Sequence, residues 1–475
     1  MDIPRDAFVD GSWRPTARRF AVRDPFDDTV IAEVADCDDA QIDEAVAAAA
    51  KAFPTWKRRP GPERGRLLRQ MGERMLADES RLAELCTREN GKPLKESVAE
   101  VRYAASFLTW FAGEAERVYG ETIPASNPGQ RLTAIREPVG PCAVITPWNF
   151  PYAMLTRKLG AALAAGCTIV AKPAESTPLG TLALAQIAQA VGLPAGVFNV
   201  VTSSDGARAG GRLVGSAAIR KISFTGSTEV GKLLMRSAAD DLKRISLELG
   251  GNAPFVVLAD ADLERAVAAA LVAKFRNTGQ TCVAANRIIV EAPVADAFTN
   301  KLVVAIAKLK TGRGLDDGVD LGPLIDDAAV AKVKRLVDDA VARGATVLLG
   351  TPPDGTTRLI PPVVLGGITS EMQLWREEIF GPVVPIRVAK DEAEAIALAN
   401  DTEYGLIAYV FTRDGARQAR VAEALEAGMI GVNEGLVSTA QAPFGGVKQS
   451  GVGREGSRHG IEDYTQLKYI AVRIE

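Results

Sequence analysis

The sequence is poor in histidine, and its cysteines follow no recognisable pattern. It contains one histidine, His459, and five cysteines, at positions 37, 86, 142, 167 and 282. The cysteines form no CxxC pair and show no metal-ligand spacing, so we expect neither a disulfide framework nor a metal site. A cysteine hydrolase needs a histidine base, and one histidine close to the C-terminus makes that class unattractive. A surface or hinge role for His459 is the simpler interpretation, and any general base is then a carboxylate.

Long apolar runs and an excess of either charge are also absent. No apolar run reaches the ~18 residues of a membrane span. The 56 basic and 59 acidic residues give a net charge of −3, which creates no field for nucleic acid or a membrane surface. The first residues, Met1–Asp6, have neither an apolar signal core nor the bias of a transit peptide. We therefore expect a cytoplasmic protein that binds neither nucleic acid nor membrane.

The first 120 residues are typical of helices, with signals for helix starts and stops. Asp38-Asp39 can cap a helix that Pro54 ends, Pro62 suits a first helical position, and Asn90-Gly91 closes a later helix. From Gly120 to Gly140 the chain becomes turn-rich, which predicts a hairpin without a core of its own. The tail at Tyr464–Val472 is an isolated strand candidate that can pair with this hairpin.

The remainder alternates between short strands and helices, in two series. Such alternation predicts parallel sheets covered on both faces, and therefore two α/β domains. The first series has strands near residues 142–146, 168–171, 197–201, 221–225 and 245–249. The second has strands near residues 255–258, 287–291, 347–349, 383–388, 408–411 and 430–432.

Cys282 stands out as a candidate nucleophile. A helical pattern opened by Asp260 or Asp262, with Leu263, Val267, Leu271 and Phe275 on one face, leads into Gly279-Gln280 and then Cys282. Gly279 suits the position just past a helix end because glycine accepts positive φ. A thiol placed by a helix terminus is held firmly, as a nucleophile requires.

Two further segments predict groups that a cysteine nucleophile needs. Asn149 lies between two prolines and two aromatic residues in Pro147–Pro151, so its amide is held still and can donate to an oxyanion; capping the next helix is the alternative. Glu248 ends the last strand of the first series and precedes two glycines, which favours a general base at the seam between the domains.

Anion-binding features occur at two places in the first series. The segment with Gly226, Ser227 and Gly231 follows a strand and opens a helix, where a phosphate is favoured, although a plain turn capped by Ser227 fits equally well. Lys172 and Glu175 follow the end of the second strand of this series, near residues 168–171, where they can hold a ribose or form a solvated charge pair. The GxGxxG match at Gly451–Gly456 follows no predicted strand, so we do not interpret it as a dinucleotide fingerprint.

Six motifs in order resemble the NAD(P)-dependent aldehyde dehydrogenase superfamily over essentially the whole chain. They lie at Pro147–Pro151, Gly226–Gly231, Glu248–Gly251, Gly279–Cys282, Glu377–Pro382 and Pro443–Gly446. The segments around residues 156–158, 275–277, 433–438 and 451–464 are more narrowly similar to succinate-semialdehyde dehydrogenases. The resemblance implies a variant Rossmann cofactor domain, a catalytic domain and a small β oligomerisation arm. The implied NAD domain consists of residues 1–122 and 141–247, and the implied catalytic domain of residues 248–440. The arm consists of residues 123–140 and 457–475, and residues 441–456 form a connection that lines the active site.

The resemblance also implies roles for individual residues. Cys282 attacks the aldehyde, Asn149 holds the oxyanion, and Glu248 activates water to hydrolyse a thioester. The cofactor is held by Trp148, Lys172, Glu175, Gly226, Ser227, Gly231, Leu249, Glu378 and Phe380. Substrates of the narrower family carry a distal carboxylate, and the residues that match its binding site are Arg157, Arg276 and Ser438, or Thr439 in place of Ser438, with Phe444 beside them. A guanidinium suits this role because it binds a carboxylate bidentately.

These implications lead to a definite expectation with open alternatives. We expect oxidation of succinate semialdehyde to succinate by a homodimer or homotetramer, with NAD preferred over NADP because the Glu175 carboxylate repels a 2′-phosphate. Glutarate semialdehyde or general aliphatic aldehydes are alternative substrates. A CoA-acylating relative would lack the glutamate at position 248. The presence of Cys282, Glu248 and Asn149 argues against a catalytically silent relative that acts as a structural or binding protein. Ala284 occupies the position where several relatives carry a second cysteine, so no disulfide lock of the nucleophile is expected.

Overall fold

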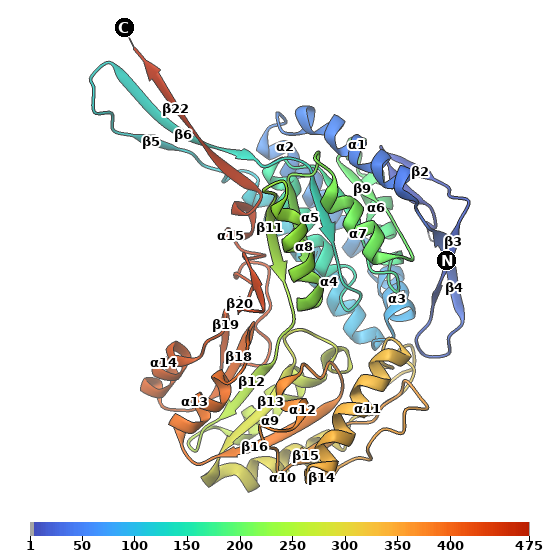
Figure 1. Ribbon diagram of the computed structural model, residues 1–475, viewed down its shortest axis with the longest axis vertical. Helices are drawn as coiled ribbons and strands as arrows, with labels where there is room; N and C mark the ends of the chain where they lie inside the picture. Colours follow the sequence, from blue (N-terminus) through green and yellow to red (C-terminus); the bar gives the residue numbers. More distant parts are fainter. Residues whose placement is uncertain (1–3, 475) are drawn as a thin grey trace.

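The protein is described by a computed structural model that covers residues 4–474, and its core is built on two large sheets (Figure 1). The first sheet has the strand order β2-β1-β9-β8-β7-β10-β11-β21. Its five central strands run parallel, as predicted, and are Phe198–Val200 (β9), Ile169–Lys172 (β8), Cys142–Ile145 (β7), Lys221–Thr225 (β10) and Arg244–Glu248 (β11). Their carboxyl ends therefore meet at one edge, where ligands of such sheets bind.

Helices cover both faces of the first sheet. One face carries α2 (Gly61–Ala77), α3 (Glu79–Asn90), α4 (Leu94–Glu114), α5 (Ala153–Ala165) and α6 (Leu179–Ala190). The other carries α1 (Asp39–Trp56), α7 (Gly206–Gly215) and α8 (Thr228–Ala239). Two buried glutamates fix helix ends: Glu89 accepts from Leu179 N and Gly180 N, and Glu100 accepts from Tyr152 N at the start of α5.

The N-terminal segment differs in part from the expectation. The Asp38 cap, the start near Pro62 and the stop at Gly91 (φ +90°) are confirmed. Pro54 does not end α1, which continues to the buried Trp56. Four strands were missed because they are short, and because all but the buried first one are partly exposed: β1 (Ala7–Val9), β2 (Ser12–Arg14), β3 (Arg19–Arg23) and β4 (Val30–Ala35).

The second sheet has the order β14-β15-β16-β13-β12-β18-β19 and is parallel except for β14. All six predicted strands are present, as Ala253–Val257 (β12), Ala285–Glu291 (β13), Thr346–Leu349 (β14), Val383–Ala389 (β16), Ile407–Phe411 (β18) and Met429–Val432 (β19). The sequence did not reveal Val363–Gly366 (β15), a buried four-residue strand that follows two prolines. The helices of this part are α9 (Leu263–Phe275), α10 (Ala295–Ile306), α11 (Asp327–Ala342), α12 (Gln373–Arg376), α13 (Glu392–Asn400) and α14 (Gly415–Ala424).

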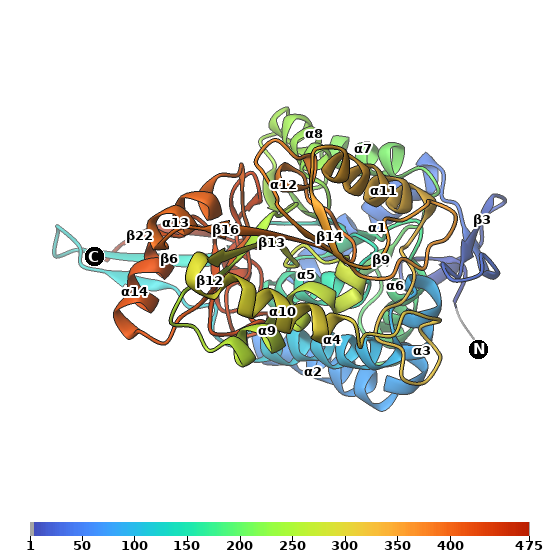
Figure 2. The same ribbon diagram turned by 90° about the horizontal axis from the view of Figure 1, so that it is seen from below.

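A three-stranded arm projects from the first sheet's side of the molecule (Figures 1 and 2). It consists of β5 (Glu121–Ile123), β6 (Gln130–Pro138) and β22 (Thr465–Arg473). Strand β22 pairs with β6 along its whole length, from Thr465↔Pro138 to Arg473↔Gln130, which confirms the predicted pairing of tail and hairpin. Leu467, Tyr469 and Val472 are exposed on it. The arm has no core of its own within residues 4–474.

Three short elements lie between β19 of the second sheet and β22 of the arm: β20 (Val447–Lys448), β21 (Gly451–Val452) and α15 (His459–Glu462). Strand β20 pairs with β17 (Tyr404–Gly405), which directly precedes β18. Strand β21 pairs antiparallel with the end of β11, with Gly451 opposite Glu248. The GxGxxG match therefore joins a sheet edge and does not form a strand-turn-helix unit.

Candidate active site between the two sheets

Cys282 lies at the end of a tight left-handed turn that follows α9. Asp262, not Asp260, caps α9 by accepting from Arg265 N at 3.2 Å. The helix ends at Phe275, and Asn277, Thr278 and Gly279 all have positive φ, at +51°, +58° and +78°. Gly279 thus needs its positive φ, as expected, but it is the last residue of this turn and not the first residue past the helix. A Cβ there would lie 2.4 Å from Gly381 O, so no other residue fits.

Hydrogen bonds hold this unusual turn in place. The Asn277 N–H donates to Glu96 Oε2 at 2.6 Å, and Asn277 Nδ2 donates to Asn149 O at 3.1 Å. Gln280 Nε2 donates to Asn277 O at 3.2 Å, while Gln280 Oε1 accepts from Ile325 N at 3.0 Å. Two non-glycine residues in the left-handed region are tolerated only when their surroundings determine them in this way. Cys282 is therefore held firmly.

A cavity of about 230 Å³ joins the turn to the carboxyl edge of the first sheet. Residues from both large sheets and their connections line it. It brings together eight of the predicted site residues, namely Trp148, Asn149, Gly226, Ser227, Leu249, Cys282, Glu378 and Phe380. The rings of Trp148 and Phe380 meet edge to face, with centroids 5.6 Å apart.

Burial raises the pKa of the half-buried Cys282 thiol to about 11. Arg157 and Arg276 oppose this by favouring the thiolate, whereas Glu378 and Glu248 disfavour it. The balance of charges around the sulfur therefore sets how much reactive thiolate is present at a given pH.

Asn149 is fixed by its backbone carbonyl. This oxygen accepts from Lys92 Nζ at 2.7 Å, and Lys92 is itself ion-paired with Glu100 at 2.6 Å and lies 4.0 Å above the Phe150 ring. Asn149 Nδ2 donates to Gln280 O at 3.3 Å, next to the Cys282 turn. The amide thus lies near the sulfur, where it can donate to an oxyanion that forms there.

Glu248 is buried at the end of β11, and its Oε2 has no hydrogen-bond partner in the described part of the chain. Burial, followed by the charge of Glu455, raises its pKa well above the usual value, and Arg157 and Lys158 oppose the shift. A carboxyl with a raised pKa can act as a base once water reaches it. A Cβ on Gly445 would lie 2.9 Å from Glu248 Oε1, so a glycine is needed beside it.

The residues proposed to hold the cofactor follow strand ends of the first sheet. Ser227, which lines the cavity, caps α8 by accepting from Val230 N at 3.3 Å, and a helix start of this kind favours an anion. A Cβ on Gly231 would lie 2.5 Å from Leu249 Cδ2, so this glycine lets Leu249 pack against α8. Lys172 pairs with the partly exposed Glu175 at 2.9 Å.

Glu378 completes the cavity from the second sheet's side. Its Oε1 accepts from Gly251 N at 3.1 Å, and burial raises its pKa to about 7. Lys172, Glu175 and Gly231 do not line the cavity itself. The helix start at Ser227 suits a phosphate, and the aromatic edge beside Glu378 suits a nicotinamide, so the cavity residues fit NAD(P).

The predicted substrate residues do not line this cavity, although the charges of Arg157 and Arg276 act on Cys282. The Arg157 guanidinium is fully buried, lies 4.3 Å from the Phe444 ring and is ion-paired with Glu455. The Arg276 guanidinium lies 5.0 Å from the Phe150 ring. Arg157 Nη1 and Arg276 Nε are buried and lack a hydrogen-bond partner among residues 4–474. Two cationic groups beside the sulfur thus retain unused donors.

The two hydroxyl candidates differ in their contacts. Thr439 Oγ1 donates to Gln441 Oε1 at 2.5 Å, whereas the Ser438 hydroxyl forms no hydrogen bond within the described residues. Ser438 is therefore the freer of the two to bind a ligand.

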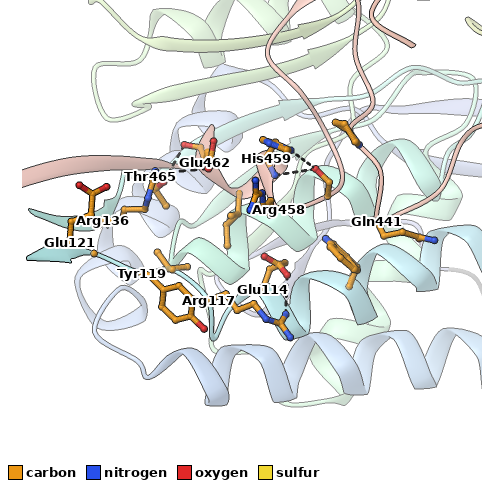
Figure 3. A pocket seen from close by; sticks show the side chains of 16 residues that line it. Glu114, Arg117, Tyr119, Glu121, Arg136, Gln441, Arg458, His459, Glu462 and Thr465 are labelled. Carbon is orange, nitrogen blue, oxygen red and sulfur yellow. Dashed lines mark hydrogen bonds and ion pairs between the residues drawn. The ribbon is translucent and has the colours of Figure 1, made fainter. Parts of the chain in front are cut away.

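His459 does not belong to this site. It is exposed, its Nδ1 lies 3.0 Å from Ser457 Oγ, and it lines a separate groove beside Arg458, Glu462 and Tyr119 (Figure 3). No histidine lines the Cys282 cavity. The cysteine-hydrolase alternative therefore lacks its base.

Several residues near the site were not found from the sequence. Lys92 directly follows a helix end, and Glu455 lies inside the GxGxxG segment that we set aside. Tyr103 lies in the N-terminal stretch for which we predicted only helices. Only the tertiary structure brings them to Asn149, Arg157 and Cys282. Among residues 4–474, no cluster of histidine, cysteine and carboxylate side chains is placed to hold a metal ion, and no helix is long and apolar enough to span a membrane.

Comparison with known proteins agrees with this geometry. Residues 13–470 match the aldehyde dehydrogenase family, and the chain belongs to this family. It is 50% identical to the glutarate-semialdehyde dehydrogenase of Pseudomonas putida KT2440 over 99% of this chain and 98% of that protein. It is 52% identical to the NADP(+) succinate-semialdehyde dehydrogenase GabD of Escherichia coli K12, over 90% of this chain and 89% of the relative. The crystal structure of the succinate-semialdehyde dehydrogenase of Burkholderia pseudomallei superimposes with a TM-score of 0.97 at 47% identity, covering 99% of this chain and 98% of that one.

Proposed function

We propose that the protein oxidises succinate semialdehyde to succinate with NAD(P). The observation that carries this proposal is the pair of guanidinium groups, Arg157 and Arg276, which flank Cys282 with buried, unused donors. Buried cationic donors without a partner are costly unless a ligand satisfies them. A short aldehyde that ends in a carboxylate satisfies them when its aldehyde carbon reaches the sulfur.

The proposed chemistry uses three residues of the chain. Cys282, as thiolate, adds to the aldehyde carbon, and the resulting oxyanion accepts from the Asn149 amide and the Cys282 N–H. Loss of one such donor typically costs about 2.7–4 kcal/mol of transition-state stabilisation. NAD(P) supplies the hydride acceptor when bound in the cavity. The thioester left on Cys282 is hydrolysed by water that Glu248 deprotonates, which releases the acid and regenerates the thiol.

We further propose that NAD is preferred over NADP. Glu175 follows the end of β8, where the adenosine ribose of a dinucleotide bound along this edge would lie. Its carboxylate accepts hydrogen bonds from a 2′-hydroxyl and repels a 2′-phosphate. Glu175 is paired with Lys172 at 2.9 Å, and its side chain is 42% exposed, which leaves it accessible to a ligand at this edge. GabD of Escherichia coli is an NADP(+) enzyme, so the proposed cofactor preference of this chain differs from that of this relative.

We also propose the division of the chain into two domains and an arm that the resemblance implies. Residues 1–122 and 141–247 form the NAD domain, 248–440 the catalytic domain, and 123–140 with 457–475 the oligomerisation arm, while 441–456 lines the active site. The two large sheets and the projecting arm support this division. The arm's exposed apolar strand supports pairing with another subunit in a homodimer or homotetramer.

A second candidate function is the oxidation of glutarate semialdehyde, which the 50% identity to the Pseudomonas putida enzyme favours. Steady-state NAD reduction with succinate semialdehyde, glutarate semialdehyde and propanal decides between the functions. We expect the highest kcat/KM with succinate semialdehyde and the lowest with propanal. A higher value with glutarate semialdehyde would establish the second candidate, and equal values for all three would refute a carboxylate site. Addition of CoA should yield no acyl-CoA.

A further inference from the structure

Tyr103 on α4 has a hydroxyl group with no hydrogen-bond partner in the described part of the chain, although its oxygen is buried. Its ring is held edge to face against Phe107, with centroids 4.8 Å apart. Of the buried tyrosines, Tyr152 donates to Leu82 O at 3.0 Å and Tyr409 donates to Val283 O at 2.8 Å, whereas the Tyr464 hydroxyl, like that of Tyr103, has no partner among the described residues. A buried hydroxyl without a partner opposes folding, so the free Tyr103 donor requires an explanation.

The surroundings of this hydroxyl are those of the candidate active site. Helix α4, which carries Tyr103, packs against α5, which carries Arg157. A Cβ on Gly456, next to Glu455, would lie 3.4 Å from the ring of Phe107, the partner of Tyr103. Burial raises the pKa of Tyr103, so the group is a neutral donor at physiological pH, and the charges of Arg157 and Arg276 act on it. Arg157 Nη1, Arg276 Nε and the Tyr103 hydroxyl are thus three buried donors without a hydrogen-bond partner among residues 4–474.

We propose that Tyr103 determines substrate specificity: its hydroxyl donates a hydrogen bond to the distal carboxylate of the substrate, alongside Arg157 and Arg276. The inference rests on the proposed function and adds a residue to it. A carboxylate has two oxygens with about four acceptor positions, so it can satisfy a neutral hydroxyl together with two guanidinium groups. The ligand class is a short aliphatic chain with a terminal carboxylate, as an aldehyde or as its dicarboxylate product.

The alternative partner for Tyr103 is the reacting oxygen at Cys282, and substrate choice separates the two roles. Butanal has the same four carbons as succinate semialdehyde but lacks the carboxylate. A hydroxyl bound to the carboxylate matters only for succinate semialdehyde, whereas one bound to the oxyanion matters for both substrates. Tyr103→Phe removes the hydroxyl and keeps the ring against Phe107.

The experiment compares kcat/KM of Tyr103→Phe and wild type for both aldehydes at saturating NAD. Loss of a hydrogen bond to a charged group predicts a fall of roughly 10- to 100-fold for succinate semialdehyde, and a change below about twofold for butanal. The inhibition constant of succinate against succinate semialdehyde should rise by a similar factor, which reports binding without turnover. Tyr119→Phe removes the same group from an exposed tyrosine that lines the groove of Figure 3, and should change none of these values.

Equal losses for both aldehydes, or no loss for either, would overturn the role of Tyr103. This outcome is distinct from failure of the proposed function, which is seen in wild type alone. If wild type does not prefer succinate semialdehyde over butanal, the carboxylate site itself is refuted. If wild type shows that preference and Tyr103→Phe keeps it, only the tyrosine assignment falls.

Discussion

Replacement of Lys92 by methionine tests how the oxyanion donor is positioned. Lys92 Nζ is fully buried and has three contacts: the Glu100 carboxylate at 2.6 Å, the Asn149 carbonyl at 2.7 Å and the Phe150 ring at 4.0 Å. Removal of one partner of a buried ion pair typically costs about 3–5 kcal/mol, because the other charge stays buried and unpaired. At about 2–4 °C per kcal/mol for a mid-sized domain, the apparent Tm should fall by roughly 10 °C.

Activity should fall for a separate reason. The Asn149 carbonyl keeps its bond from Asn277 Nδ2 but loses its bond to the ammonium, so the amide is held less firmly. A small misplacement of a catalytic group can cost about 100-fold, and complete loss of an oxyanion donor about 100- to 1,000-fold. We therefore expect kcat to decrease by roughly 10- to 100-fold.

A second variant separates the two effects. Lys92→Met combined with Glu100→Gln removes both charges, so much of the lost stability should return while kcat stays low. Calorimetry and steady-state kinetics on the same preparations measure both quantities. Lys95→Met is the control, because this exposed lysine pairs with Asp320 at the surface and should change stability by under about 1 kcal/mol. Recovery of both Tm and kcat in the double variant would refute the positioning of Asn149 by Lys92, and an unchanged Tm in Lys92→Met would refute the cost of the unpaired charge.

Three further predictions concern charge. Arg276→Gln should raise the pKa of Cys282 and slow its alkylation by iodoacetamide at pH 8.5 by roughly 3- to 10-fold, whereas Glu378→Gln should lower that pKa and speed alkylation. If both variants change the alkylation rate in the same direction, the proposed balance of charges around the sulfur is contradicted. Burial lowers the pKa of Lys274 to about 7, and its Nζ has no hydrogen-bond partner among residues 4–474. Between pH 7 and pH 10 this lysine is therefore protonated in the unfolded chain but neutral in the folded one. The free energy of unfolding then increases with pH over this range, because the unfolded chain binds more protons. Lys274→Met should therefore raise Tm at pH 6.5 by an amount that shrinks toward pH 10, and a constant difference across this range would refute the shift. Glu175→Ser should increase the NADP/NAD ratio of kcat/KM at least about 10-fold from a wild-type value below unity, and a wild-type ratio above unity would overturn the assigned cofactor preference.

The sequence predicted the features of the fold that depend on local periodicity. The parallel strands of both sheets have hydrophobic runs and clear turn residues, and the tail strand could be matched to the hairpin because neither had another partner. Val363–Gly366 was missed since four apolar residues after prolines carry no period, although this strand lies inside the second sheet. Pro54 was given too much weight as a helix stop, because the burial of Trp56 maintains the last turn of α1.

The site was predicted only where a motif surrounds the reactive group. Cys282, Asn149 and Glu378 lie in short segments of distinctive composition, and the structure brings them to one cavity. The left-handed turn before Cys282 could not be foreseen, since Asn277 and Thr278 adopt positive φ only because Glu96, Asn149 and Gln280 hold Asn277. Tyr103 and Lys92 act across more than 50 residues of sequence, and no local pattern marks such contacts.

The central claim is that the Cys282 sulfur becomes acylated by the substrate during oxidation. The most direct measurement is the rate of NAD reduction with succinate semialdehyde by Cys282→Ser, compared with wild type at equal concentration of folded protein. The account predicts a loss of roughly 1,000-fold or more, because a serine hydroxyl without an adjacent histidine base is a poor nucleophile. Undiminished oxidation by Cys282→Ser would contradict it.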